Sequence, residues 1–489
     1  MTSTVSCDTA SAGSGKRALS ARVLAGLILA APLPGCTLGP SPAAPILPSP
    51  ATRWNAGSDT AEWPTARWWT AFASPELDQL IAEAESRNLD LVAARARLGQ
   101  ADAQARIAGA PLLPTLSAAP VVDETQRVAA SGRLQRFGTL GGTVTASYQI
   151  DIWGRNRDIL RSARESTRAA AYDGAVTRIT IIAGVAATYF NLLATQDQLA
   201  LSKAQLADAN ALLEGYRVQL QHGLIAGLQV EQQRAFAEQL AAGIPAIEAQ
   251  RTHLADALAV LTARNPEGFS VTGGSLADLA VPPIVAGIPS GLLAHRPDIR
   301  EAEHDLAAAG ADIQAARKSF LPTFGLSASG GAESVALSSA VTSPTGIFDI
   351  GLSVLQPIFA GGRLRGQVDL SNERYRELAA AYLKAIHQAY GDVEDALAST
   401  GAAREQLARQ DAATASAQRA VMMAKAGYRA GMTDALPLLL SQQTLSGAQA
   451  QQVQARLGQV LSLVGLYKAL GGGWSVTESP GNADTRDPG

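Results

Sequence analysis

Residues 143 to 152 read Thr-Val-Thr-Ala-Ser-Tyr-Gln-Ile-Asp-Ile, so apolar and polar side chains alternate along them. A period of two is typical of a β-strand with one apolar and one polar face. From Gly154 to about Gln221 the sequence contains no proline, and apolar residues recur three and four positions apart. This spacing predicts a helix of about 67 residues, which at ~1.5 Å per residue would extend for about 100 Å. A strand followed by so long a helix excludes a compact globular domain.

The same succession of patterns occurs twice in the chain, at a constant shift of 208 residues. Leu113-Pro114 aligns with Leu321-Pro322, Gly154-Arg155 with Gly362-Arg363, and Gly223 with Gly431. We therefore predict two copies of one unit, each with a strand pair, a long helix and a return helix. The remaining expected elements are a second alternating strand around 348–354, a second long helix from Gly362 to about Ala430, return helices at about 228–263 and 434–470, and loops at about 125–140 and 332–346.

The apolar stripes of the long helices could form a single coiled-coil seam, but alanine is frequent on several of their faces. This frequency favours helices that pack closely on both sides, as in a closed wall. Within the first long helix, residues 179 to 196 carry no charge. Polar residues interrupt this stretch, so we expect a buried helix segment and not a membrane span.

The N-terminus has the layout of a secretory signal. Lys16, Arg17 and Arg22 precede an apolar run at 23–33 that is too short for a stable transmembrane helix. The run ends in Leu33-Pro34-Gly35-Cys36, which resembles a bacterial lipobox, and this resemblance implies cleavage before Cys36 and acylation of its thiol. A plain cysteine after an ordinary signal is the alternative. The predicted segments are a lipoprotein signal peptide at 1–35, a lipidated extended segment at 36–74, a first repeat at 75–264, a linker at 265–290, a second repeat at 291–473 and a flexible tail at 474–489.

Four strands in a membrane cannot form a closed barrel. An open sheet edge in hydrocarbon would leave backbone N–H and C=O groups unpaired, at several kcal/mol each. Copies of the chain must therefore combine their strands. Two copies would give eight strands, a barrel filled by its own side chains, and three copies would give twelve, enough for an aqueous lumen. A soluble periplasmic helical lipoprotein with small edge hairpins is the alternative.

Composition and motifs give little support to other classes of function. The formal net charge of −3 argues against nucleic acid as a partner, because phosphate binding needs a basic face. The five histidines show no metal-ligand spacing, and we expect His295 and His304 to lie on a solvated helix face. Since no nucleophile elbow or paired-cysteine motif occurs either, we expect neither an enzyme nor a cofactor other than the lipid on Cys36.

The order of elements, the duplication and the lipobox resemble the TolC-like outer membrane efflux proteins, in their lipoprotein (NodT/OprM-like) branch. The resemblance covers about residues 36 to 473. Its most specific pattern is Arg296-Pro-Asp-Ile-Arg300 with Phe320-Leu-Pro322 downstream. Further matching patterns are Trp68-Trp69 followed by Phe72, Asn88-Leu-Asp-Leu91, Asp151-Ile-Trp-Gly-Arg155 and Phe359-Ala-Gly-Gly-Arg363.

This resemblance implies a mainly α-helical protein with a membrane β-barrel: a homotrimer with a twelve-stranded barrel in the outer membrane and a helical tunnel through the periplasm. It implies an exit duct that does no chemistry and works with a periplasmic adaptor (membrane fusion) protein and an inner membrane RND transporter, in contact with outer membrane lipid. The outer channel of a type I protein secretion system has a similar architecture and remains an alternative.

The resemblance places a gate at the periplasmic helix turns. Asp434 is the candidate for a ring of carboxylates at the aperture, since the aspartate common in the family is Leu440 here; capping of the helix by Asp434 is an equal alternative. Candidate adaptor contacts are Gly223, Leu224, Gly431 and Met432, with packing within the turn as the alternative. Candidate latches of a closed state are Tyr428 and Arg429, although exposed pairs usually contribute little.

Overall fold

The computed structural model describes residues 45–49, 53–55, 63–283, 286–287, 289–334 and 345–474. The predicted signal segment and Cys36 lie outside these ranges, as does the tail after Trp474. The chain separates into two units, Met1–Ser41 and Pro42–Gly489, and all elements below belong to the second unit.

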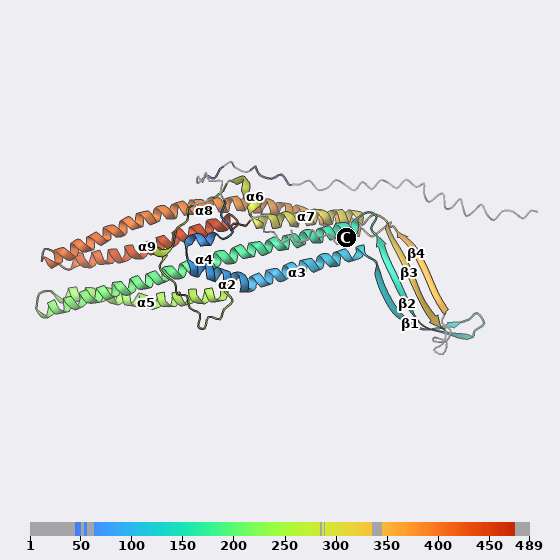
Figure 1. Cartoon of the computed structure of the whole chain (residues 1–489), viewed down its shortest axis with the longest axis horizontal. Coiled ribbons are helices and arrows are strands. Elements are labelled where there is room, and N and C mark those ends of the chain that lie inside the picture. Colours follow the sequence, from blue (N-terminus) through green and yellow to red (C-terminus); the bar gives the residue numbers. More distant parts are fainter. Residues whose placement is uncertain are drawn as a thin grey trace, which may run out of the picture. The chain divides into compact units, whose positions relative to one another are not determined.

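The element order repeats a helix, a strand pair, a long helix and a return helix (Figure 1). The first half contains η1 (Trp68–Phe72), α2 (Pro75–Arg87), α3 (Leu89–Gly109), η2 (Ala110–Leu112), β1 (Thr115–Val128), β2 (Leu134–Ile150), α4 (Arg155–Gln221) and α5 (Gly227–Leu261). The second half contains η3 (Leu276–Asp278), η4 (Pro289–Gly291), α6 (Leu292–His295), α7 (Pro297–Lys318), β3 (Thr323–Ser334), β4 (Thr345–Leu355), α8 (Arg363–Arg429) and α9 (Leu436–Ala469).

The two long helices confirm the predicted duplication. Helices α4 and α8 each contain 67 residues, and both their first and their last residues differ by the 208 positions of the sequence repeat. Each begins directly after a glycine with positive φ, Gly154 at 75° and Gly362 at 85°. A glycine adopts this conformation without a steric penalty, so the chain can turn sharply from the sheet into the helix.

The strands form one antiparallel sheet in the order β1-β2-β3-β4. Thr115 pairs with Ser147 in the first hairpin and Thr323 with Leu355 in the second, so the two registers are also related by the shift of 208. The loop predicted at 125–140 is wrong, because β1 continues to Val128 and β2 begins at Leu134. Glycines and polar residues obscure the alternation there, but backbone pairing needs no apolar side chain.

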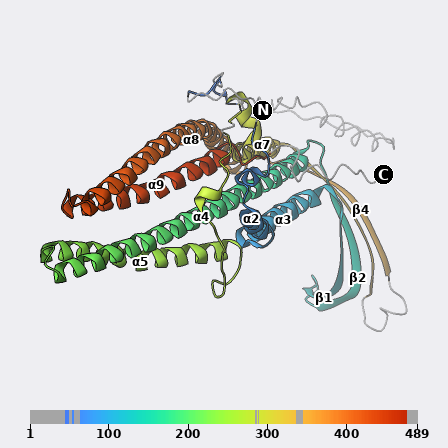
Figure 2. The same ribbon diagram turned by 60° about the vertical axis from the view of Figure 1, so that its left-hand side comes forward.

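The helices lie side by side in a single curved layer, seen from two directions in Figures 1 and 2. Near the sheet, α3 packs on α4, and α7 lies between α4 and α8. At the other end, α5 packs on α4, and α9 takes the position between α4 and α8. One free edge of the layer is therefore formed by α3 and α5, and the other by α8.

Three apolar clusters of described residues hold this layer together, and the third joins Leu213, Tyr216, Val230 and Ala435 near the helical tips. In the first, Phe72 of η1 packs on Phe190 of α4, with ring centroids 4.9 Å apart. In the second, α8 residues such as Ile386 and Val393 bury themselves against Ile299 of α7. Helix α4 contains a stretch long and apolar enough to cross a membrane, but 56% of that stretch is buried within the protein. This agrees with its prediction as a buried helix segment.

Candidate functional site: the sheet and the helical tips

The four-stranded sheet has one apolar and one polar face. Because residues paired across antiparallel strands point to the same side, the observed register assigns every side chain to a face. Apart from Glu124 and Gln126 towards the outer end of β1, the apolar face contains Leu116, Val122, Val144, Tyr148, Ile150, Phe324, Leu326, Phe348, Ile350, Leu352 and Val354. The other face contains Thr115, Ser117, Thr143, Thr145, Ser147, Gln149, Ser327, Ser329, Asp349 and Ser353.

The apolar face is not covered by any part of the chain that the structure describes. Phe348 is 89% exposed and Ile350 is 82% exposed. A contiguous apolar surface of this kind is a site of membrane or protein contact. Its alternation with Thr and Ser is the pattern of a membrane barrel with lipid outside and water inside.

Both outer edges of the sheet are free of backbone pairing within the described residues: β1 pairs only with β2, and β4 only with β3. In hydrocarbon, the unpaired N–H and C=O groups at each edge would cost several kcal/mol each. A sheet with two such edges would therefore have to pair with further strands in order to be stable in hydrocarbon.

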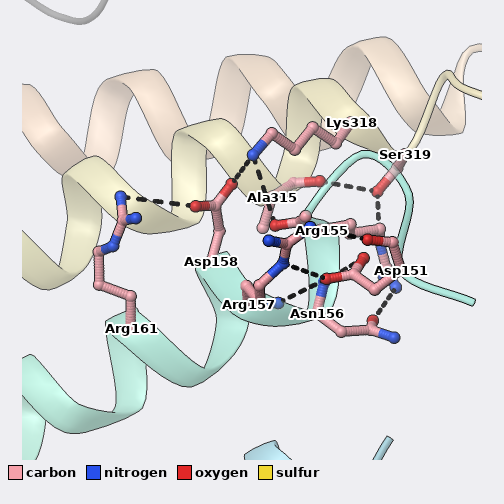
Figure 3. Close-up of polar contacts among 10 residues, drawn as sticks. Asp151, Arg155, Asn156, Arg157, Asp158, Arg161, Ala315, Lys318 and Ser319 are labelled. Atoms are coloured by element: carbon pink, nitrogen blue, oxygen red, sulfur yellow. Dashed lines mark hydrogen bonds and ion pairs between the residues drawn. The ribbon is translucent and has the colours of Figure 1, made fainter. Parts of the chain in front are cut away.

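Charged side chains fix the junction between the sheet and the helices (Figure 3). The Asp151 carboxylate accepts hydrogen bonds from the backbone N–H groups of Asn156 and Arg157 at 3.1 and 3.0 Å, and so caps α4. Burial by itself would raise the pKa of Asp151, but these bonds and the Arg157 guanidinium lower it overall.

A buried ion pair ties α4 to α7 at the same junction. Lys318 Nζ lies 2.5 Å from Asp158 Oδ2, and the Asp158 side chain is only 4% exposed. Beside it, the Arg155 guanidinium donates to Ser319 Oγ at 3.0 Å. Asp158 Oδ1 also lies 3.6 Å from the Arg161 guanidinium, so the buried carboxylate has a cation from each of the two helices.

The two helical hairpins end in the same kind of turn. The N–H of Gly223 bonds to the carbonyl of Leu220, and the N–H of Leu224 bonds to that of Gln219. The N–H groups of Gly431 and Met432 make the equivalent pair of bonds at the end of α8. This is the Schellman motif, which needs a left-handed residue; φ is 68° at Gly223 and 70° at Gly431. The two glycines therefore have a structural role in ending the helices.

The residues after these glycines project from the turns. Leu224 is 72% exposed and Met432 is 75% exposed, so neither fills its own turn. Their exposure argues against packing within the turn, and contact of these side chains with an adaptor stays a prediction.

One hydrogen bond joins the two hairpins near their tips. The Tyr428 hydroxyl of α8 donates to Gln219 Oε1 of α4 at 2.5 Å. The Tyr428 ring also packs edge-on against Tyr216, with centroids 5.7 Å apart. Tyr216 is 1% exposed, and its hydroxyl has no partner among the described residues. Burial raises the pKa of Tyr216, as do Tyr428 and Asp434, so this phenol stays neutral.

Asp434 and Arg429, the other two candidate residues at the tips, have different surroundings in the structure. Asp434 Oδ1 accepts a hydrogen bond from the backbone N–H of Leu436, the first residue of α9, at 3.2 Å, while the residue at the N-cap position is Ala435. The Asp434 side chain is exposed, so its two predicted roles, at the helix N-terminus and in a carboxylate ring, both stay predictions. Arg429 is exposed and forms no ion pair with any residue of the described ranges.

Sequence reasoning missed Gln219 and Tyr216, the partners of Tyr428. The only available signal was an aromatic or amide residue within two turns of each tip glycine. The prediction of solvated histidines was wrong. His304 Nδ1 lies 2.7 Å from Glu165 Oε2 and its ring stacks on Tyr172, while His295 stacks on Trp63. Among the described residues, no group of three or more metal-ligating side chains could hold a metal ion.

The chain is similar to known proteins in both sequence and fold. The family model described as "Outer membrane efflux protein" matches residues 80–264 and 288–472. The pyoverdine export outer membrane protein OpmQ of Pseudomonas aeruginosa is 38% identical over 83% of this chain and 87% of that protein. The CmeC outer membrane channel of Campylobacter jejuni superposes with a TM-score of 0.83 at 25% identity, over 90% of this chain and 96% of that one. The Neisseria gonorrhoeae MtrE channel in its open state gives 0.80 at 28% identity, over 89% and 98%.

Proposed function

The chain belongs to the outer membrane efflux protein family, and on this premise we propose that it is the exit duct of a tripartite efflux pump. The observation that carries the proposal is the sheet, which has an apolar face, a polar face and two unpaired edges. Only closure with other copies in a lipid bilayer satisfies all three features. The subunit does no chemistry in this role.

Three copies form the duct. Four strands per chain give twelve strands in a trimer, which is wide enough for water, whereas two copies would give an eight-stranded barrel filled by side chains. The Thr- and Ser-rich face then lines the lumen. Such a lining carries few charges that would select one solute, so the identity of the exported compound is set by the pump that delivers it.

An inner membrane transporter and a periplasmic adaptor complete the assembly. Relatives are named for pyoverdine export, toluene efflux and cation efflux, which indicates that one architecture serves different small molecules. The exposed Leu224 and Met432, beside the turns at Gly223 and Gly431, provide apolar contacts for the adaptor.

Acylation of Cys36 anchors the N-terminus in the outer membrane. One lipid group alone binds a membrane only modestly, so the barrel supplies the permanent attachment and the lipid adds to it. The anchor is the only covalent group that the proposal requires.

The tips form the gate. The Tyr428–Gln219 bond holds α8 against α4, so an outward movement of the second hairpin must break it. Asp434 lies at the start of α9 in the same region, where three copies would surround the pore with carboxylates. Arg429 is exposed in the single chain, and its part in the latch stays a prediction.

Purified protein inserted into a planar lipid bilayer tests the function. We expect discrete ion-conducting steps, because a trimeric barrel opens a continuous water-filled path. Folded protein that inserts but never conducts, even after the tip latch has been removed by substitution, would overturn the proposal. Deletion of the gene, scored against a panel of antibiotics, dyes, solvents and metal ions, would then identify the exported class.

A further inference from the structure

A cavity of about 370 Å³ opens between α3 and α4, away from both the sheet and the helical tips. Its lining is mainly apolar: Leu91 and Leu98 come from α3, and Trp474 lies at one side. The Trp474 ring packs edge-on against Tyr172 of α4, with centroids 5.6 Å apart, and the residue is only 5% exposed. The volume is within the range of about 300–1,000 Å³ that is usual for small-molecule sites.

The second repeat shows the same place in a filled form. At the shift of 208, Gly174 and Ala175 of α4 correspond to Tyr382 and Leu383 of α8. Tyr382 is 8% exposed and belongs to an apolar cluster with Ile299 of α7. At Gly174, in contrast, a Cβ would meet no atom within 4 Å among the described residues outside its own stretch of helix. The cavity therefore results from small residues at these two positions and not from the fold that both repeats share.

The rim of the cavity carries an excess positive charge. Its charged residues are Glu85 of α2, Arg95 of α3 and Arg178 of α4. The Arg178 guanidinium lies 2.7 Å from Glu85 Oε1, so these two charges compensate each other. Arg95 instead donates to the backbone carbonyl of Glu85 at 3.0 Å, and within the described residues it has no carboxylate partner. One guanidinium is thus left to attract an anion.

The fold does not require this set of charges. The residues of the second repeat that correspond to Glu85, Arg95 and Arg178 are Leu293, Glu303 and Ile386. The second repeat therefore forms the same helix pair without a cation at any of the three positions. An apolar cavity and an uncompensated guanidinium occur together only in the first of these two equivalent places.

We propose that this cavity binds a small molecule with an apolar body and one carboxylate group. The body lies against Leu91, Leu98 and Trp474, where its removal from water supplies the affinity. The carboxylate accepts hydrogen bonds from Arg95, which fixes the orientation of the ligand. The inference goes beyond the export function, because the site is formed by the wall of one chain and includes neither the sheet nor the gate.

Photoaffinity labelling with 4-benzoylbenzoate tests the site. This probe is an aromatic carboxylate that attaches to neighbouring residues on illumination, and 4-benzoylbenzamide is its uncharged counterpart. The full-length protein would be labelled in lipid nanodiscs, and the labelled peptides would be identified by mass spectrometry. We expect saturable labelling of peptides from 91–98 or 170–178, stronger with the carboxylate than with the amide by roughly tenfold or more, because hydrogen bonds to charged groups are the stronger ones.

Two variants remove the two features separately. Gly174→Leu fills the cavity, and Gly215→Leu is its control, since Gly215 is an exposed glycine of the same helix with equally open space around it. Arg95→Gln removes the charge at the rim, and Arg106→Gln is the control on the same helix, where Arg106 is exposed. We expect Gly174→Leu and Arg95→Gln each to reduce labelling by the carboxylate roughly tenfold or more, and the two controls to leave it unchanged. Thermal unfolding of all four variants establishes that they are folded.

Equal labelling of the parent and Gly174→Leu would overturn the cavity as the site. Equal labelling by carboxylate and amide, or no effect of Arg95→Gln, would overturn the assignment of an anionic ligand. Absence of saturable labelling in the parent would overturn the proposal as a whole. If a chain that ends at Trp474 is labelled where the full-length chain is not, residues 475–489 occupy the cavity and the proposed ligand does not. All of these results leave the conductance of the channel, and so the proposed function, unaffected.

Discussion

Replacement of Tyr428 by Phe removes the hydrogen bond that joins α8 to α4 near the helical tips. The hydroxyl donates to Gln219 Oε1 at 2.5 Å, and nothing else in that contact depends on the oxygen atom. The phenyl ring retains its edge-on packing against Tyr216, with centroids 5.7 Å apart in the parent. The substitution therefore weakens the latch without creating a cavity.

The size of the effect follows from the number of copies. A protein hydrogen bond contributes about 0.5–1.5 kcal/mol net, so three latches that open together contribute about 1.5–4.5 kcal/mol. Since 1.4 kcal/mol corresponds to a factor of ten, the ratio of open to closed channels should rise roughly 10-fold to 10³-fold. If the copies open one at a time, each step should become easier by roughly 2- to 13-fold.

Single-channel recording in planar bilayers measures this ratio from open and closed dwell times. Tyr390→Phe is the matched control, because it removes from α8 a buried hydroxyl that has no hydrogen-bond partner among the described residues. Gln219→Ala should reproduce the effect of Tyr428→Phe, and the double variant should add little to either. Dwell times of Tyr428→Phe that match those of the parent and of Tyr390→Phe would refute the latch.

Three further predictions concern the anchor, the aperture and the response to pH. Cys36→Ser should abolish incorporation of labelled fatty acid, and unchanged labelling would exclude this residue as the lipid site. Asp434→Asn should keep the hydrogen bond from the backbone N–H of Leu436 but reduce block of the channel by multivalent cations at low ionic strength. Identical block of the Asp434→Asn and parent channels would leave Asp434 with a role at the helix N-terminus alone. Burial raises the pKa of Glu301 from 4.5 to about 7, and the nearby carboxylates of Asp173, Asp305 and Asp298 add to this shift. The protonated side chain therefore contributes stability to the folded protein below pH 4.5, and this contribution should be lost as the pH rises towards 7. Glu301→Gln should remove this loss of stability and stabilise the trimer at pH 8 by about 1–2 kcal/mol, after allowance for solvent screening. If the stabilities of variant and parent change in parallel between pH 4.5 and about pH 8, the raised pKa of Glu301 is contradicted.

The sequence was sufficient to predict the features that local chemistry determines. Proline-free stretches and the glycines at 223 and 431 predicted where the long helices end, because only a left-handed residue completes those turns. Alternation around Val144 and Tyr148 predicted the two-faced sheet. The 208-residue shift predicted that both halves share one structure.

Features that depend on contacts between distant segments could not be predicted from local sequence patterns. The outer ends of β1 and β2 carry Gly138, Gly141 and Thr125, which give no alternating signal, and only their pairing reveals a strand. His304 reads as a surface residue of α7 until α4 supplies Glu165 beside it. The bond between Tyr428 and Gln219 links positions 209 residues apart, which no local pattern connects.

Single-particle imaging of the mature protein in lipid nanodiscs tests the central claim most directly. We predict three copies around a continuous bore, with twelve strands in the bilayer and β4 of each copy paired with β1 of its neighbour. A particle of one chain, or a solid trimer without a bore, would contradict the account.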